Sequence, residues 1–380
     1  MASGTRREDS MNPAEGAACN IAPPPHRRRE AWAAALPTAE QSIFLRACVQ
    51  PGPAGRDAWR EWLSIVVDPI AAFRDAGEYR PLAALLYASL RDHEAELGVP
   101  REFVTVLRTA VVREEVRTRQ YVGLVASMLA TLESASVEPL VLSGASLAAT
   151  VYPNGTLRHC HDLDLLVRPE ELARAGDALR SLGCTQRSHA ELVHPSRLAV
   201  LLHTTLLPVP PAQNVADRVR SRAISVTIAG RAACTLAPAD ALLHVCVHGF
   251  SARARRSIQW AVDAHFLVER HPDLDWAVSL ETTRAAGLTV PFAVTLRFLH
   301  DELAAAVPRP VLDGLESAAR NSAARRIAVS MLPVRERAWR RWARHLPAPA
   351  RRVGRRLLGR PLARPSNNSS STPNDNVITA

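Results

Sequence analysis

The sequence lacks lysine altogether, and it is poor in aromatic residues. All 47 residues in the combined Lys and Arg count are arginines, and aromatic residues make up only 5% of the 380 residues. A hydrophobic core must therefore be built mainly from Ala, Leu and Val. Because hydrophobic residues still reach 47% and charged residues 22%, the composition is that of a globular protein and excludes a chain that is disordered throughout.

Long apolar runs and paired cysteines are also missing. No stretch of about 18 apolar residues without charge occurs, so we expect no membrane-spanning helix. The polar N-terminus contains no apolar core of a secretory signal. The six cysteines are scattered and form no CxxC pair. This pattern favours free thiols in a reducing, cytoplasmic setting over a disulfide framework or a structural zinc site.

The net charge of +10 is concentrated near the C-terminus. Residues 335–364 hold eleven arginines against one glutamate, so the rest of the chain sums to about zero. Trp339, Trp342 and Leu346 follow helical spacing among these arginines, which predicts an amphipathic basic helix. Two interpretations remain open: contact with an anionic surface such as a membrane or a nucleic acid, or a helix packed on the domain with a solvated Arg face.

Changes in composition and hydrophobic spacing divide the chain into five parts. Residues 1–30 are polar, as in a disordered leader, whereas 31–137 show the apolar spacing of helices. Residues 138–232 contain short apolar runs separated by turn signals, which predicts strands and short helices. Helical spacing returns over 233–346, and 347–380 form a basic and then disordered tail. These patterns predict an α+β fold, with a small mixed β-sheet flanked by N-terminal and C-terminal helical regions.

More specific elements follow from the same signals. Pro100 stands where a long helix of about 101–136 is expected to begin. The predicted strands and helices of the remaining chain are, in order, a strand at 140–142, a helix at 147–152, a strand at 162–167, a helix from 169 to about 183, and strands at 197–209 and 224–228. A helix that Pro238 and Asp240 open is predicted to run through Val247, and further helices are predicted at about 256–270, 275–286, 291–305 and 309–330.

Two aspartates are the most informative residues of the central part. Asp162 and Asp164 are two positions apart in a predicted strand, so both point to the same face. Two carboxylates this close repel each other unless a cation lies between them, and Mg²⁺ bound by carboxylates and substrate phosphates suits that arrangement. Gly144 follows another predicted strand and would let the backbone approach a triphosphate. The alternative is an acidic strand edge without a ligand.

The wider pattern resembles the uncharacterised nucleotidyltransferase family of the polymerase-β-type superfamily. The resemblance rests on short motifs in a fixed order over roughly residues 45–300. The motifs are Ser143-Gly144-Ala145, Tyr152-Pro153, Arg158 four residues before Asp162-Leu163-Asp164-Leu165-Leu166-Val167, His244, His248-Gly249, and Trp260-Ala261-Val262-Asp263.

The resemblance implies a nucleotidyltransferase palm and transfer of a nucleoside monophosphate from a nucleoside triphosphate. Two ions, Mg²⁺ or alternatively Mn²⁺, would be bound by Asp162 and Asp164 as metal ligands and catalytic residues. Gly144 would lie under the phosphates, together with the neighbouring turn residue Ser143, and Ser146 would donate to a phosphate. Arg158 is a partner for phosphate or carboxylate, or alternatively pins its own loop.

Two departures from the family pattern bear on catalysis. Ser143 stands where the family usually has Lys, and Leu201 aligns with a third carboxylate on a later strand. Glu191, which precedes this strand, is the alternative source of the third carboxylate, but the spacing does not establish that it takes this role. His203 shares a strand face with Leu201. Two interpretations are open: His203 reaches the site, or it is a structural histidine.

Other histidines and acids give weaker signals. His159-Cys160-His161 alternates between strand faces and has no second ligand pair, so a zinc site is not expected. His244 and His248 share a helix face but lack the Glu of a metalloprotease motif. Asp263 is interpreted as a helix cap or as an ion-pair partner of Arg253, Arg255 or Arg256, with substrate contact as the alternative.

The sequence thus predicts a Mg²⁺-dependent nucleotidyltransferase acting on a hydroxyl of a small molecule or peptide. The alternative, suggested by Ser143 and Leu201, is a catalytically degenerate member that serves as a binding or scaffold protein. A third reading is a nucleic-acid-binding module, in which the Arg-rich segment 335–364 binds with a steep dependence on salt.

Overall fold

The computed structural model describes residues 32, 35–75, 79–207, 213–251, 257–320 and 322–332. The predicted leader, the Arg-rich segment and the C-terminal tail lie outside these residues. The helices and strands are α2 Ala39–Val49, α3 Gly52–Ile65, α4 Pro69–Asp75, α5 Ala83–Leu90, α6 Arg101–Ser134, β1 Leu140–Val141, α7 Ser143–Thr150, β2 Asp162–Leu166, α8 Leu172–Ser181, β3 Thr185–Ser188, β4 Glu191–Val193, β5 Ala199–His203, α9 Gln213–Ser221, β6 Ile224–Ile228, β7 Arg231–Thr235, α10 Pro238–Phe250, α11 Gln259–Arg270, α12 Trp276–Ala285, α13 Thr289–Leu303, α14 Arg309–Ala318 and α15 Ser322–Met331. Short 3-10 helices occupy Arg80–Leu82, Arg91–His93, Gly155–Leu157 and Pro169–Glu171.

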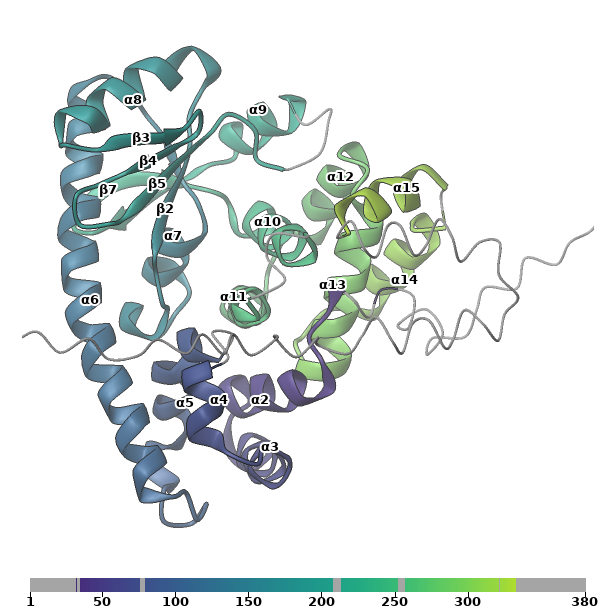
Figure 1. Ribbon diagram of the computed structural model, residues 1–380. Coiled ribbons are helices and arrows are strands. Elements are labelled where there is room, and N and C mark those ends of the chain that lie inside the picture. The colour runs from purple at the N-terminus through teal and green to yellow at the C-terminus, as the bar shows by residue number, and fades with distance from the viewer. Residues whose placement is uncertain are drawn as a thin grey trace, which may run out of the picture.

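The seven strands form one mixed sheet in the order β3-β4-β5-β2-β1-β7-β6. Strand β2 lies near the centre, parallel to β5 and antiparallel to β1. The helices α2 to α5 lie on one side of the sheet region and the helices from α10 onward on another, as Figure 1 shows. The predicted α+β fold, a small mixed sheet between two helical regions, is confirmed.

Helix α6 connects the N-terminal helices to the sheet. It begins directly after Pro100, runs for 34 residues, and borders one side of the molecule in Figure 1. Phe103 and Leu107 belong to the core of the helical regions, whereas Val125 and Leu132 belong to the core beneath the sheet. A single helix therefore joins the two hydrophobic cores. Within the described residues, not even this helix combines length with enough apolar character to cross a bilayer.

Strand β2 illustrates why one sheet face is buried and the other is not. Leu163 and Leu165 are almost completely buried in the core that α6 and α8 share with the sheet. Because successive side chains of a strand point to opposite faces, Asp162 and Asp164 point to the other face and remain partly exposed. The alternation of acidic and apolar residues thus positions the two carboxylates.

Several boundaries differ from the sequence predictions. The single helix predicted for 309–330 is two helices, α14 and α15. Helix α7 begins at Ser143, four residues before the predicted start, and the strand predicted for 197–209 is limited to Ala199–His203. The short strands β3, β4 and β7 were not predicted, because β3 is exposed throughout and the other two are too short or too polar to show a clear apolar run.

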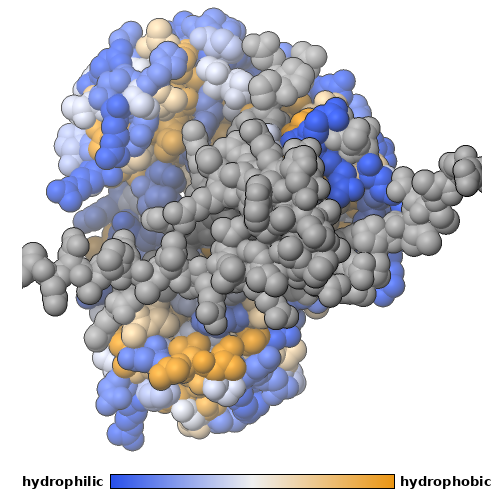
Figure 2. Space-filling model, turned by 45° about the vertical axis from the view of Figure 1, so that its right-hand side comes forward, coloured by the Kyte–Doolittle hydropathy of each residue, from blue (hydrophilic) through white to orange (hydrophobic). Residues whose placement is uncertain are grey.

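The face of the molecule drawn in Figure 2 is hydrophilic over much of its area and carries hydrophobic patches. Figure 2 shows a hydrophobic patch in the lower part of that view, over the N-terminal helices. The exposed large hydrophobic side chains include Ile65, at the end of α3, and Val67 just after it.

A glycine in α10 allows close packing of two helices of the C-terminal region. A Cβ atom at Gly249 would overlap the indole ring of Trp260 in α11. We expect Gly249→Ala to lower the free energy of unfolding by about 1–3 kcal/mol, the usual cost of overpacking. Gly314 in α14 has open space around its Cα, so Gly314→Ala should instead stabilise the protein slightly. Urea unfolding of both variants measures the difference, and an unchanged stability of Gly249→Ala would contradict the packing argument.

Candidate functional site

The chain enters the site through a sharp turn between β1 and α7. Leu142 donates its backbone N–H to the carbonyl of Asp164 at 2.9 Å, which places the next residue, Ser143, beside the aspartates. Ser143 has a φ of 41°, a left-handed conformation that costs a non-glycine residue about 1–2 kcal/mol. Such strain at a single residue is often found at functional sites.

Gly144 lies close to the segment that precedes β2. A Cβ atom at this position would lie 3.0 Å from Nη1 of Arg158 and 3.6 Å from Sγ of Cys160. The absence of a side chain therefore lets the start of α7 pack directly on the Arg158 guanidinium. Ser146, one turn of helix after Ser143, is buried and donates its hydroxyl to the carbonyl of Ser143 at 3.0 Å. Ser146 thus supports the turn in this structure.

The two aspartates share one face of β2 but differ in their surroundings. Their side chains are 28% and 22% exposed. Burial and the nearby charge of Asp164 raise the pKa of Asp162. Burial also pushes the pKa of Asp164 upward, but the hydrogen bond and charge of His203 outweigh it and hold this pKa below its usual value. The pair is therefore two mutually repelling carboxylates on an accessible surface.

Strand β5 brings His203 to this pair. His203 Nε2 lies 2.7 Å from Oδ1 of Asp164. The parallel register sets Leu201 opposite Asp164, on the same face. Glu191 in β4 is opposite Leu201, so it lies on the same face two strands from Asp164. Its carboxylate is bound by Arg187 at 3.0 Å.

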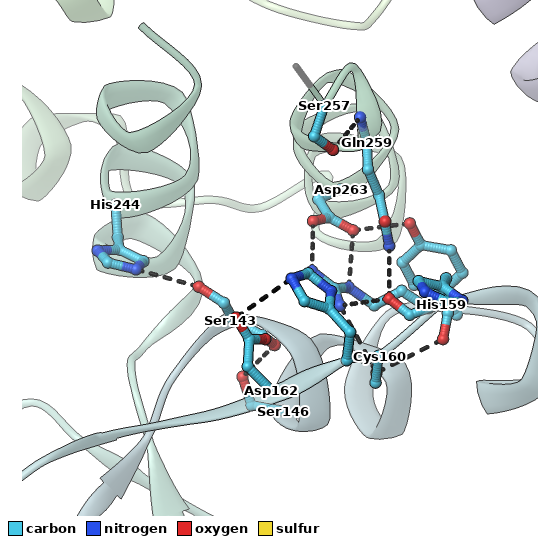
Figure 3. Close-up of polar contacts among 12 residues, drawn as sticks. Ser143, Ser146, His159, Cys160, Asp162, His244, Ser257, Gln259 and Asp263 are labelled. Carbon is cyan, nitrogen blue, oxygen red and sulfur yellow. Dashed lines mark hydrogen bonds and ion pairs between the residues drawn. The ribbon is translucent and has the colours of Figure 1, made fainter. Parts of the chain in front are cut away.

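Helix α10 contributes a buried histidine. His244 Nε2 lies 3.1 Å from Oγ of Ser143, and His248 is one turn further along the same helix (Figure 3). Burial, and secondarily the neighbouring His248, lower the pKa of His244 to about 3, although Asp164 and the carbonyl of Leu206 act in the opposite direction. The imidazole of His244 is therefore neutral at any physiological pH.

Acidification is expected to destabilise the protein through this histidine. The pKa of His244 is about 3 in the fold, against 6.5 for an ordinary histidine. Between these values the unfolded chain binds more protons than the folded one, so the free energy of unfolding falls as the pH drops, by up to about 1.4 kcal/mol per pH unit from this residue. Urea unfolding between pH 4 and pH 7.5 should give a flatter profile for His244→Gln than for the wild type. Equal slopes would contradict the assignment.

Arg158 and Asp263 form a buried ion pair beneath the site. Nε of Arg158 donates to Oδ1 of Asp263 at 3.0 Å, and Nη2 donates to Oδ2 at 2.8 Å. The hydroxyl of Tyr152 donates to the same carboxylate at 2.7 Å. Sequence analysis left Arg158 as a partner for phosphate or carboxylate, or as a residue that pins its own loop. In the structure its guanidinium is bound to the carboxylate of Asp263, which holds the loop in place. Asp263 pairs with Arg158, whereas Arg253, Arg255 and Arg256 lie outside the described residues.

Contacts from α6 and α11 fix the backbone before β2. His159 Nδ1 lies 2.8 Å from Oε2 of Glu114, and the carbonyl of His159 accepts from Gln259 at 3.1 Å (Figure 3 shows the latter). The hydroxyl of Tyr121 donates to the carbonyl of Asp162 at 2.9 Å. Sequence reasoning missed Glu114 and Tyr121, because they are about 40 residues away along the chain and carry no local motif.

The described part of the chain contains no set of three or more His, Cys, Asp or Glu side chains grouped so as to hold a metal ion. Among these side chains, His159 contacts Glu114 and Cys160 contacts Arg158. The aspartate pair is thus an incomplete set of ligands by itself. A cation there would need further ligands from a substrate or from water.

Comparison with known proteins identifies the family. Residues 72–304 match the family described as uncharacterised nucleotidyltransferase, which is more than half of the chain. The match includes the β1–α7 turn, the aspartates of β2, and the helices α10 and α11. No curated protein and no solved structure matches the chain. The chain belongs to the uncharacterised nucleotidyltransferase family, and its general activity is nucleotidyl transfer.

Proposed function

We propose that this protein is a Mg²⁺-dependent nucleotidyltransferase that moves a nucleoside monophosphate from a nucleoside triphosphate to a hydroxyl of a small molecule or peptide. The observation that carries the proposal is the pair Asp162 and Asp164 on the accessible face of β2, beside the strained turn at Ser143 and Gly144. An acidic pair beside a turn at a helix start is suited to binding a triphosphate together with a divalent cation.

The residues present fit a hard divalent ion. Carboxylate oxygens are the donors that Mg²⁺ prefers, with substrate phosphates and water completing its shell. Burial and then the charge of Asp164 raise the pKa of Asp162, and a cation held by both carboxylates would relieve the repulsion that Asp162 experiences. When bound, Mg²⁺ or the alternative Mn²⁺ supplies positive charge that stabilises the developing charge on the phosphates.

The proposed roles of the remaining residues follow from their positions. Asp162 and Asp164 bind the cation and orient the triphosphate. Gly144 begins α7 together with Ser143 and packs on the Arg158 guanidinium, and the backbone of this turn is assigned to the phosphates. Ser146 and Arg158 act on this site by holding the turn and the loop before β2. In the transfer itself, the acceptor hydroxyl loses its proton to water and its oxygen bonds to the α-phosphorus, while the bond from that phosphorus to the bridging oxygen breaks and pyrophosphate departs.

Calorimetric titration of the full-length protein with Mg·ATP, Mg·GTP, Mg·CTP and Mg·UTP tests the proposal. We expect saturable binding of at least one nucleotide, and much weaker binding when Mg²⁺ is chelated. The nucleotide that binds most tightly identifies the donor. No binding of any of the four nucleotides, with either Mg²⁺ or Mn²⁺, would contradict the proposal.

Leu201 favours a second candidate function, a catalytically degenerate member that binds without turnover. Leu201 lies opposite Asp164 and places an apolar side chain where a further carboxylate would tighten the binding of a cation. If the wild type binds nucleotide but does not transfer it, Leu201→Asp is expected to tighten Mn²⁺ binding at least about tenfold, because it adds an acid beside Asp164. Electron paramagnetic resonance of Mn²⁺ measures this change. Robust transfer by the wild type would exclude the degenerate function.

A further inference from the structure

The sheet face that carries the aspartates continues across β5 and β4, which follow β2 in the sheet (Figure 1). On β5, Ala199 is paired with Asp162, and Leu201 is paired with Asp164. On β4, Val193 is paired with Ala199. Because the side chains of paired residues lie on the same face, these three apolar residues extend outward from the aspartates. We call Ala199, Leu201 and Val193 the apolar strip.

The apolar strip takes no part in the hydrophobic cores of the described part of the chain. Its three side chains are partly exposed, and neither core of the described residues includes them or has them packed against it. Their neighbours along the strands, Val200 and Leu192, point to the other face and are buried beneath α6 and α8. Apolar surface in contact with water is unfavourable, so covering the strip with an apolar ligand would favour binding.

The charges around the apolar strip are acidic or already paired. Glu191 lies opposite Leu201 on the far side from the aspartates, and its carboxylate is bound by Arg187. The strands β2, β4 and β5 place three acids on this face and contain no arginine. A nucleic acid is held mainly by Lys and Arg side chains at its phosphates. The surface therefore suits an uncharged apolar group and does not suit a polyanion.

We propose that the apolar strip binds the acceptor of the transfer reaction, and that this acceptor is an uncharged small-molecule alcohol with an aromatic or branched aliphatic group near its hydroxyl. The inference rests on the proposed function, because it names the class of substrate that receives the nucleoside monophosphate. Continuity with the aspartates supports this occupant, since a group lying on Leu201 is one strand, about 4.8 Å, from Asp164. The strip spans two strands, which is about the size of one ring.

Fluorine NMR of 2-(4-fluorophenyl)ethanol with the full-length protein tests whether such a ring binds beside the aspartates. Mn²⁺ is added, because a paramagnetic ion broadens the resonances of nuclei close to it. We expect the fluorine resonance to broaden far more with protein and Mn²⁺ together than with Mn²⁺ alone. The extra broadening should disappear in the double variant Asp162→Asn with Asp164→Asn. Electron paramagnetic resonance reports separately whether each protein binds Mn²⁺.

Substitutions that make the apolar strip polar test its role in binding. Leu201→Gln should weaken binding of the fluorinated alcohol about tenfold, and Val193→Gln about threefold, because each removes apolar area from the contact. Mn²⁺ affinity should stay within about twofold of the wild type in both variants, since neither removes a carboxylate. Val67→Gln is the matched control, because Val67 is fully exposed among the N-terminal helices and should leave both affinities unchanged. Urea unfolding verifies that all variants are folded.

A transfer assay compares acceptors that differ in the ring. With Mg²⁺ and the nucleotide that binds most tightly, mass spectrometry should show transfer to 2-phenylethanol with a kcat/KM at least about tenfold above that for ethylene glycol, which offers a hydroxyl without a ring. The advantage should be lost in Leu201→Gln. Preferential transfer to ethylene glycol, or to a single-stranded oligonucleotide with a free 3′-hydroxyl, would overturn the inference.

The outcomes separate this inference from the proposed function. If Mn²⁺ binds to Asp162 and Asp164 but the fluorine resonance does not broaden further, the inference is wrong and the proposed function stands. An unchanged affinity of Leu201→Gln for the fluorinated alcohol would have the same meaning. If the wild type binds neither Mn²⁺ nor any of the four nucleotides, both are overturned.

Discussion

Replacing Asp162 and Asp164 together by asparagine is expected to reduce nucleotidyl transfer by roughly a thousandfold or more. The two carboxylates carry the negative charge on this face of β2 that a cation would bind, and neutral amides bind a hard divalent ion much more weakly. A thousandfold loss corresponds to about 4 kcal/mol of transition-state stabilisation, a realistic share for metal-assisted transfer. Initial rates of pyrophosphate release with saturating nucleotide measure the loss.

The same double variant should fold as well as the wild type. The double substitution removes the repulsion that Asp164 exerts on Asp162, but it also removes the ion pair of Asp164 with His203, so the two effects offset each other. Urea unfolding should therefore give a stability within about 1 kcal/mol of the wild type, which separates a functional defect from misfolding. Asp177→Asn, an exposed acid beside Arg180 in α8, is the matched control and should retain full activity. Full activity of the double variant would contradict the assignment of the site.

Glu191 provides a related test of how the site manages without an acid at Leu201. Register places Glu191 on the same face as Asp164, but two strands away and bound to Arg187. We expect Glu191→Gln to change the transfer rate by less than about threefold, since the carboxylate already has a partner and lies beyond direct reach of the pair. A loss as large as that of the double aspartate variant would make Glu191 the missing third carboxylate.

The parts of the site that could be predicted from the sequence are those carried by local periodicity. The alternation through Asp162, Leu163 and Asp164 specifies a strand with one acidic face, and the structure has that strand. The register sets Leu201 opposite Asp164, because the two strands are parallel neighbours. Family resemblance supplied the function, since an acidic strand face alone is compatible with many proteins.

The parts that could not be predicted depend on contacts between distant segments. His244 shares a helix face with His248 in the sequence, but nothing in α10 indicates that its ring reaches Ser143, 101 residues earlier. The ion pair between Arg158 and Asp263 joins residues 105 positions apart. Long-range pairing of this kind leaves no periodic signal. The sequence therefore offered only a choice of partners for Arg158 and for Asp263.

Removal of the carboxylate of Asp263 is expected to cost the protein about 3–5 kcal/mol of its free energy of unfolding. The side chains of Arg158 and Asp263 are 10% and 5% exposed, and the pair is joined by two hydrogen bonds. Asp263→Ala would leave the guanidinium buried without its counter-charge and would also deprive the hydroxyl of Tyr152 of its acceptor. Breaking one half of a buried ion pair is strongly destabilising for this reason. Urea unfolding at neutral pH measures the change.

Two comparisons show whether the loss comes from the uncompensated charge. Replacing both partners, in the double variant Arg158→Met with Asp263→Leu, should cost much less than the single substitution, because no charge remains buried. Asp57→Ala, which breaks an exposed pair with Arg60, should cost less than about 1 kcal/mol. Because Arg158 also packs under Gly144, Asp263→Ala should weaken nucleotide binding even under conditions in which the variant is fully folded. A loss of stability no greater than that of Asp57→Ala would show that the buried pair does not hold the loop before β2 against helix α11.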